Sequence, residues 1–395
     1  MKNSIMDYVY WRGNITFLDE KYNDVDYLII SELAYVNLDD IVIYKSMTLK
    51  ELYQLYKQRN DSLEEKDLTP IYNESHYLFE AVSKARRYQN IQIINYINDL
   101  DKDLVKQFSA ITFLLENQTL FVSYRGTDDS LIGWHEDFLM LCESVVPSQL
   151  SSVQYLKHVS QYQYTDSFLK TLKNKNLGTM KERLFKYFQY KKNGFPILIG
   201  GHSKGGNLAM YASCFCDDHI QERIQKIYNF DGPGFQDTIT LSAEYKKMLH
   251  RIISYIPHYS FFGIVLNHDE EYHVVNSFYT GMLQHNAFSW NVSPNGFVED
   301  ELSYESVQFA IKVILFLKDL SYKQKKDFVK TMFGLFDSLE LYTFTDLSHM
   351  SYKHILAGIK ELTLLDGSMR KMLIEVLHML WLEAKKNEKR INKDS

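Results

Sequence analysis

The segment that most constrains this chain is residues 197–207, which read ILIGGHSKGGN. An apolar run, FPILIG, comes before GHSKG at 201–205, and the helix-like segment NLAMYASCF comes after it. In a G-x-S-x-G turn the serine stands at the apex of a strained strand-to-helix connection, and the glycines let strand and helix pass without collision. We therefore predict that Ser203 is a nucleophile, with the backbone N–H of Lys204 at the start of the following helix facing a developing oxyanion.

Two other interpretations of this glycine-rich turn compete with that prediction. A phosphate-binding loop needs the order G-x-x-x-x-G-K-[ST], whereas here Ser203-Lys204 come before Gly205, so the order argues against it. A strand-to-helix turn without chemistry stays open. In the nucleophile interpretation only the N–H of Lys204 matters, and its side chain is expected to reach solvent. His202 is expected to point away from the serine and pack.

The hydrophobic pattern predicts an α/β architecture. A hairpin of strands and four further short apolar strands are expected, at 111–115 with 119–124, and at 196–200, 224–230, 251–257 and 272–277. Apolar strands without polar alternation, separated by helical connections, indicate a buried and mostly parallel sheet.

Helical spacing surrounds this predicted sheet. Apolar residues recur at intervals of three and four at 26–56 and 76–88, and again from about residue 301 onward. We expect a hydrolase-type domain over 1–300, with an N-terminal helical segment at 1–105 included. A C-terminal helical region over 301–395 is expected to pack on that domain or to cap the site.

A serine nucleophile needs a base and a second oxyanion donor. The strand at 119–124 runs into SYRGTDD, so the N–H and hydroxyl of Thr127 are expected beside the serine. The chain order Ser, acid, His directs the search for the base to the residues after Ser203. His285, in GMLQHNAFSW, ranks first because a loop beyond the last predicted strand can bring it over the nucleophile.

The acid that orients this histidine is ambiguous. Asp269, in LNHDEEY, is the first choice, and Asp231, which ends the predicted strand IYNF, is the second. Without such an acid the imidazole loses the correct tautomer and the enzyme much of its rate.

Composition argues against several other classes of function. The 395 residues carry 44 Lys and Arg against 50 Asp and Glu, a formal net charge of −6, so no nucleic-acid partner is expected. No apolar run of about 18 residues occurs, and no signal-peptide core opens the chain, so no stable membrane insertion is expected. Three cysteines are too few for a disulfide framework and indicate a reducing, cytoplasmic compartment. The cluster HDEEYH would alternate faces along a strand, so no metal site is expected there.

Several motifs in order carry a family resemblance. SYRGTDDSLIGWHEDF, GGHSKGGNLAMYA, IYNFDGPGF and QHNAFSW together resemble the bacterial Mbeg1-like family, a branch of the α/β-hydrolases similar to class 3 lipases. MDYVYWRGNITF and KQFSAITF also resemble it, so the likeness covers roughly residues 6–300.

The resemblance implies the α/β-hydrolase fold and an esterase or lipase type of activity. By position it implies that Ser203 is the nucleophile, Thr127 the oxyanion residue after R-G, and His285 the late histidine that precedes an aromatic pair. The lipase pattern also has an aspartate before a V-P element, whereas SYIPHYS in this chain has none. The acid therefore stays open between Asp269 and Asp231.

From these residues we expect a serine hydrolase that cleaves a carboxylic ester through an acyl-serine intermediate. The expected substrate is a small-molecule or lipid-like ester, and the chemistry needs no cofactor. Two alternatives stay open: a hydrolase-fold protein that binds a ligand or partner without catalysis, and an acyl thioesterase.

Overall fold

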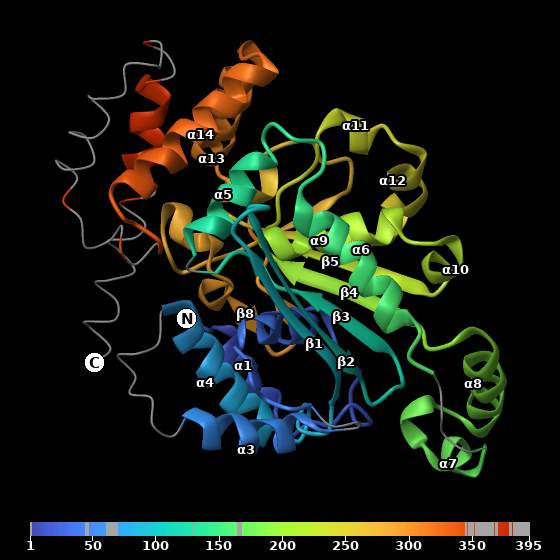
Figure 1. Ribbon diagram of the computed structural model, residues 1–395. Helices are drawn as coiled ribbons and strands as arrows, with labels where there is room; N and C mark the ends of the chain where they lie inside the picture. Colours follow the sequence, from blue (N-terminus) through green and yellow to red (C-terminus); the bar gives the residue numbers. More distant parts are fainter. Residues whose placement is uncertain are drawn as a thin grey trace.

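The computed structural model describes residues 2–43, 47–60, 70–128, 130–163 and 168–343, together with 346, 351, 367, 370–378 and 381. Its centre is a seven-stranded sheet in the order β1-β2-β3-β4-β5-β6-β7 (Figure 1). The strands are β1 Gln92–Asp101, β2 Lys106–Leu114, β3 Leu120–Tyr124, β4 Ile197–His202, β5 Ile224–Phe230, β6 Ile252–Pro257 and β7 Tyr272–Val275. A separate two-stranded ribbon pairs β8 Val292–Ser293 with β9 Gly296–Phe297.

The sheet is antiparallel at one edge and parallel through the rest. The strands β1, β2 and β3 pair antiparallel, and β3 to β7 pair parallel in sequence order. Every residue of β3 and β4 is buried, as expected for parallel strands covered on both faces. The predicted hairpin, the four further strands and the mostly parallel sheet are confirmed. The strand β1 was not predicted, because QIINYINDLD carries polar side chains along a partly exposed edge.

Helices cover both faces of the sheet. Along β3, Leu120 and Val122 belong to one hydrophobic cluster and Phe121 to the other, because side chains alternate across a strand. One cluster is completed by α1 Ile5–Arg12, α2 Asp24–Glu32, α3 Leu49–Asn60 and α4 Pro70–Lys84. The other is completed mainly by α6 Pro147–Ser160, α9 Lys204–Phe215 and α12 Ala243–Met248. Figure 1 shows these two layers, with α1, α3 and α4 on one side and α6 and α9 on the other.

The remaining helices lie around this core. They are α5 Leu131–Leu139, α7 Phe168–Lys173, α8 Met180–Asn193, α10 Asp218–Gln221, α11 Asp237–Thr240, α13 Tyr304–Asp319 and α14 Tyr322–Ser338. The N-terminal helical pattern predicted at 26–56 is two helices, α2 and α3, and the pattern at 76–88 corresponds to α4. None of the described helices is long and apolar enough to cross a membrane.

A third hydrophobic cluster joins α5 to the C-terminal helices. Leu131 of α5 is buried with Phe328, Met332 and Phe336 of α14, and Leu373 belongs to the same cluster. The helical pattern predicted from residue 301 is thus observed for α13 and α14, whereas most residues after 343 lie outside the described ones. The division into units at residue 300 stays a prediction.

Candidate active site

Ser203 stands alone between the end of β4 and the start of α9. Its backbone has φ 57° and ψ −135°, a strained conformation for a residue with a side chain. A Cβ added at Gly205 would fall on the carbonyl oxygen of Tyr124, and one at Gly206 on the amide oxygen of Asn229. Only glycine lets α9 start so close to the sheet, so this local geometry is that of a nucleophile elbow.

Two further side chains complete a chain of hydrogen bonds with Ser203. The Nε2 of His285 lies 2.9 Å from Ser203 Oγ, and its Nδ1 lies 2.6 Å from Asp231 Oδ2. The Asp231 side chain is fully buried, and that of His285 is 21% exposed. The structure thus brings together the predicted nucleophile, the predicted base and the second-choice acid.

Sheet register explains why Asp231 faces the same site as Ser203. His202 and Phe230 are paired across the parallel strands β4 and β5, and Ser203 and Asp231 are the next residue after each. The other carboxylate oxygen of Asp231 accepts from the Ser260 hydroxyl and from the N–H of Gly263 at 3.1 Å. These donors fix the buried carboxylate against the imidazole.

Asp269, the first-choice acid, does not pair with His285 in the structure. It lies on the segment before β7, and its partly exposed carboxylate pairs with Lys246 of α12. The preference for Asp269 over Asp231 as the partner of His285 was therefore wrong. The physical reason is that Asp269 lies just before β7, which runs parallel to β4 and β5. Asp269 therefore lies at the opposite end of the sheet from the residues that directly follow β4 and β5.

His202 holds the backbone that carries the base. Its Nε2 lies 2.7 Å from the carbonyl oxygen of His285, and its Nδ1 lies 3.2 Å from Glu32 Oε1. Burial lowers the pKa of His202 well below its usual value and raises the pKa of Glu32 well above. A neutral imidazole that donates through Nε2 has an acceptor at Nδ1, and the Tyr35 hydroxyl lies 3.5 Å from that nitrogen. The expectation that His202 only packs was therefore incomplete, because its ring also holds the backbone carbonyl of His285.

The loop after β3 lies against the elbow. A Cβ at Gly126 would meet the carbonyl oxygen of His202 and, at 3.0 Å, the Cβ of Ser203. The next residue, Thr127, is nearly buried and donates its hydroxyl to Asp137 Oδ2. Burial raises the pKa of Asp137 to about 6. Both predicted oxyanion residues, Thr127 and Lys204, therefore lie next to Ser203 in the fold.

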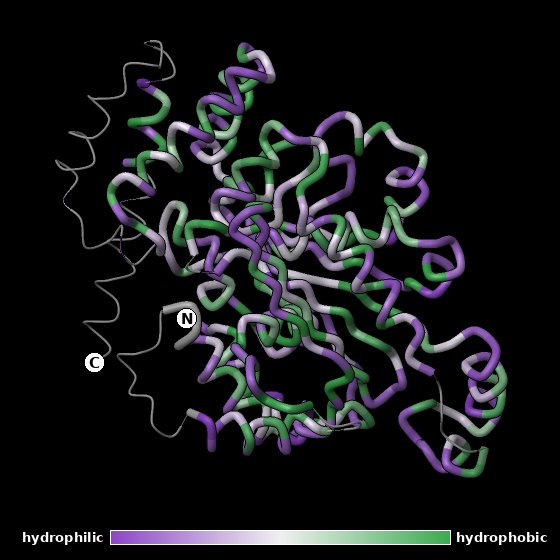
Figure 2. Tube along the Cα trace, viewed as in Figure 1, coloured by the Kyte–Doolittle hydropathy of each residue, from purple (hydrophilic) through white to green (hydrophobic). Residues whose placement is uncertain are grey.

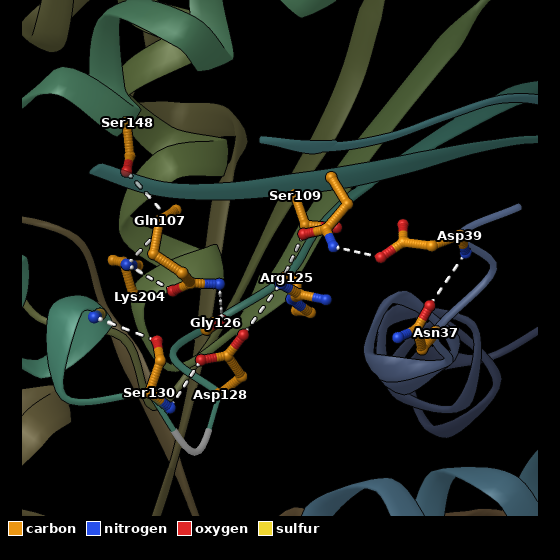
Figure 3. Close-up of polar contacts among 12 residues, drawn as sticks. Asn37, Asp39, Gln107, Ser109, Arg125, Gly126, Asp128, Ser130, Ser148 and Lys204 are labelled. Carbon is orange, nitrogen blue, oxygen red and sulfur yellow. Dashed lines mark hydrogen bonds and ion pairs between the residues drawn. The ribbon is translucent and has the colours of Figure 1, made fainter. Parts of the chain in front are cut away.

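The Lys204 side chain was expected to reach solvent, and this expectation was wrong. It is fully buried, and its Nζ donates to the Gln107 carbonyl oxygen at 3.0 Å, to Gln107 Oε1 at 2.8 Å and to Glu136 Oε2 at 3.1 Å. The Nε2 of Gln107 lies 3.5 Å from the carbonyl oxygen of Gly126. Figure 3 shows Lys204, Gln107 and Gly126 as one connected set.

This set ties the elbow to the oxyanion loop. Because a trans peptide points its C=O and N–H in opposite directions, holding the Gly126 carbonyl at Gln107 fixes the direction of the Thr127 N–H. Glu136, which is also buried, accepts from the N–H of Gln107 and the N–H and hydroxyl of Ser148. Sequence reasoning missed this network, since its members come from β2, α5, α6 and α9.

An apolar pocket opens over Ser203. Its polar lining residues are Asp137, Ser203 and Lys204. The apolar lining comes from α5, the turn after β5, the loop after β6 and the C-terminal helices: Trp134, Phe138, Met140, Leu141, Pro233, Phe261, Phe262, Val265, Leu266, Phe309, Val313, Phe316, Leu317, Phe328, Met372 and Val376. The ring of Phe262 also lies 4.3 Å from that of His285.

Within the described parts of the chain, no three His, Cys, Asp or Glu residues converge as a metal site.

A seven-stranded, mostly parallel sheet flanked by helices, with a serine elbow after a central strand, is an α/β-hydrolase fold. The sequence profile of the Mbeg1-like family matches residues 82–334, more than half of the chain. The chain belongs to the Mbeg1-like family. A search of curated proteins found no sequence relative.

Several solved lipases overlap the fold distantly. Lipase II from Rhizopus niveus is 12% identical, with 72% of this chain and 88% of that chain covered and a TM-score of 0.34. Lip2 lipase from Yarrowia lipolytica is 10% identical, with 73% and 88% covered and a TM-score of 0.34. M37 lipase is 13% identical, with 61% and 70% covered and a TM-score of 0.33.

Proposed function

We propose that this protein is a serine hydrolase that cleaves a carboxylic ester with an apolar acyl chain. The observation that carries the proposal is the hydrogen-bonded series from Ser203 Oγ through the His285 imidazole to the Asp231 carboxylate. A strained serine, a base within hydrogen-bond reach and a buried acid that orients the base are the parts that acyl transfer through serine requires.

The proposed reaction has two halves. Ser203 Oγ attacks the ester carbonyl carbon while its proton moves to His285 Nε2, and the N–H groups of Lys204 and Thr127 stabilise the oxyanion. The tetrahedral intermediate collapses, the proton passes to the alcohol oxygen, and an acyl-serine is left. Water then gives a proton to His285 and attacks the acyl carbon, which releases the carboxylic acid and restores the serine hydroxyl.

The apolar pocket supports an acyl chain as the substrate group. Its lining is aromatic and aliphatic apart from the residues at Ser203, which suits a hydrocarbon chain next to a reacting ester. Phe309 and Val313 of α13, Phe328 of α14 and Met372 contribute to this lining. We therefore propose that the region 301–395 caps the site of the domain over 1–300.

A non-catalytic binding protein was the main alternative, and it depended on a histidine that lacks an acid. The contact between His285 and Asp231 takes away that support.

We also propose a cytoplasmic location. Its support is that the three cysteines are free, with Cys214 and Cys216 buried, which suits a reducing compartment.

The test is hydrolysis of p-nitrophenyl esters of increasing chain length, with acyl thioesters in parallel. We expect turnover that rises from acetate to longer chains and is lost in Ser203→Ala. Faster turnover of thioesters than of oxygen esters would assign the protein as a thioesterase instead. Turnover that persists in Ser203→Ala would contradict the proposal.

A further inference from the structure

A helical hairpin outside the site has an unusual surface. It consists of α7 Phe168–Lys173, the short turn Lys175–Leu177 and α8 Met180–Asn193. In Figure 1 it projects at the lower right, beyond the end of the sheet. Leu177 and Tyr190 anchor it in the core, where the Tyr190 ring lies 6.0 Å from that of Phe195.

The hairpin exposes large apolar side chains. On α8 the exposed fractions are 60% for Met180, 68% for Phe185 and 62% for Phe188, and Leu184 is also exposed. At about 100° per residue these four side chains fall within about 140° of the helix circumference. On α7 Leu169 is 67% exposed. This is a contiguous stripe of side chains that water solvates poorly, not scattered single residues.

The same hairpin is strongly basic. Residues 168–193 hold eight basic side chains and one acidic one, Glu182, a formal charge of +7 in a chain whose net charge is −6. The basic residues are Lys170, Lys173, Lys175, Lys181, Arg183, Lys186, Lys191 and Lys192. Of these, Lys181, Lys191 and Lys192 are exposed and fall in the same arc of α8 as the apolar stripe. Figure 2 shows hydrophilic and hydrophobic segments alternating along this hairpin.

We propose that the α7–α8 hairpin docks this protein on the surface of an anionic phospholipid bilayer. Phenylalanine, leucine and methionine side chains on one face gain by entering the boundary between headgroups and acyl chains. The lysines beside them would then meet lipid phosphates, whose negative surface attracts basic segments. Charge complementarity selects this occupant over a second copy of the chain, which would bring two hairpins of +7 together.

Docking here does not depend on the proposed reaction. The hairpin leads into the first residue of β4, whereas Ser203 follows the last, so the two are separated by the length of a six-residue strand, about 20 Å. The surface therefore holds the protein at the membrane with the Ser203 pocket at the opposite end of the strand. Substitutions in the hairpin are expected to leave hydrolysis of a soluble short-chain ester unchanged.

The experiment is flotation of the full chain with two kinds of vesicle, phosphatidylcholine alone and phosphatidylcholine mixed with phosphatidylglycerol. We expect binding to the mixed vesicles only, weakening as salt rises from about 0.1 M to 1 M and the screening length falls from about 10 Å to about 3 Å. Phe185→Ser with Phe188→Ser should reduce partitioning at least tenfold. The triple change Lys181→Gln, Lys191→Gln and Lys192→Gln should reduce it by roughly 100-fold, because each lysine near an anionic surface contributes roughly a factor of five.

Matched variants separate the hairpin from general stickiness and net charge. Leu100 and Leu104 are 52% and 58% exposed beside Asp99, Asp101 and Asp103, and their change to serine should leave binding unaltered. Changing Lys318, Lys323 and Lys330 to glutamine removes the same charge elsewhere and should also have little effect. Circular dichroism checks that each variant is folded.

Three results would overturn the docking proposal. They are no binding to mixed vesicles, equal binding to neutral ones, and an oligomer of the wild type that the Phe185 and Phe188 changes convert to monomer. The last would assign the stripe to a self-interface. Since activity on a soluble ester is recorded for every variant, failure of docking and failure of the hydrolase proposal are seen separately.

Discussion

At the scale of single residues, the residues of the candidate site differ in how readily the sequence predicts them. Ser203 was predictable because its motif is local and its flanking strand and helix are visible in the sequence. Asp231 was ranked second, although it directly follows the strand that pairs with β4, and this register is the signal that identifies it. The Lys204 network could not be predicted, since Gln107 and Glu136 lie 97 and 68 residues away in the chain.

Removal of the buried Lys204 ammonium is predicted to destabilise the fold. Lys204→Met leaves the buried Glu136 carboxylate without its cation, so we expect a loss of about 3 kcal/mol in the free energy of unfolding. Urea denaturation measures this. The matched control, Lys246→Met, removes a surface partner of Asp269 and should cost less than about 1 kcal/mol. Equal effects of the two changes would contradict the assigned role of Lys204.

Asp137 gives the stability a dependence on pH. Burial raises its pKa from 3.8 to about 6, so between those values the folded protein keeps a proton that the unfolded chain releases. Stability attributable to this group therefore falls as pH rises from about 4 to 6 and stays low above that. Asp137→Asn removes the charge and should stabilise the protein by up to about 3 kcal/mol at pH 7.

Urea denaturation of wild type and Asp137→Asn between about pH 4 and pH 8 checks this sign. The difference between the two proteins should grow with pH and vanish near pH 4. A difference that shrinks as pH rises would show that the charged form of Asp137 is the one that the fold favours, through Thr127 and Lys204.

At the scale of elements, the sequence predicted strands better than helix boundaries. The strands β3, β4 and β6 are short and mostly apolar, and β5 is apolar except for the exposed Gln225 and Lys226 near its start. By contrast, β1 is half polar and carries a bulge between Ile93 and Asn95. The segment 26–56 keeps helical spacing across its length, yet the chain leaves the helix after Glu32 and resumes it at Leu49. Tertiary packing, not local periodicity, sets those two ends.

Helix α13, which contributes to the pocket lining, is predicted to control the length of acyl chain that the site accepts. Val313 is nearly buried and lines the pocket, so Val313→Trp should fill space that a long acyl chain occupies. We expect kcat/KM for long-chain esters to fall about tenfold or more relative to short-chain esters. The control is Ile311→Trp on the same helix, where the side chain is 42% exposed and outside the pocket lining. An unchanged chain-length ratio in Val313→Trp would remove α13 from the acyl site.

At the scale of the whole molecule, the two proposed functions of this chain would use opposite ends of the parallel strands. The residues that follow β4 and β5 form the candidate site under α5 and the C-terminal helices, and the basic hairpin precedes β4 (Figure 1). The net charge of the chain does not indicate this arrangement, because −6 is a sum that includes the local charge of +7 on the α7–α8 hairpin. Composition alone led us to expect no nucleic-acid partner, and it gave no sign of this basic surface.

The central claim is that Ser203, His285 and Asp231 act together as a nucleophilic unit. Its most direct test is covalent labelling by a fluorophosphonate, with the modified residue identified by mass spectrometry. We predict a single adduct on Ser203 in wild type and in Asp269→Asn, and labelling slowed by about 10³- to 10⁴-fold in Asp231→Asn. No adduct on Ser203 in the wild type, or slowing in Asp269→Asn but not in Asp231→Asn, would contradict it.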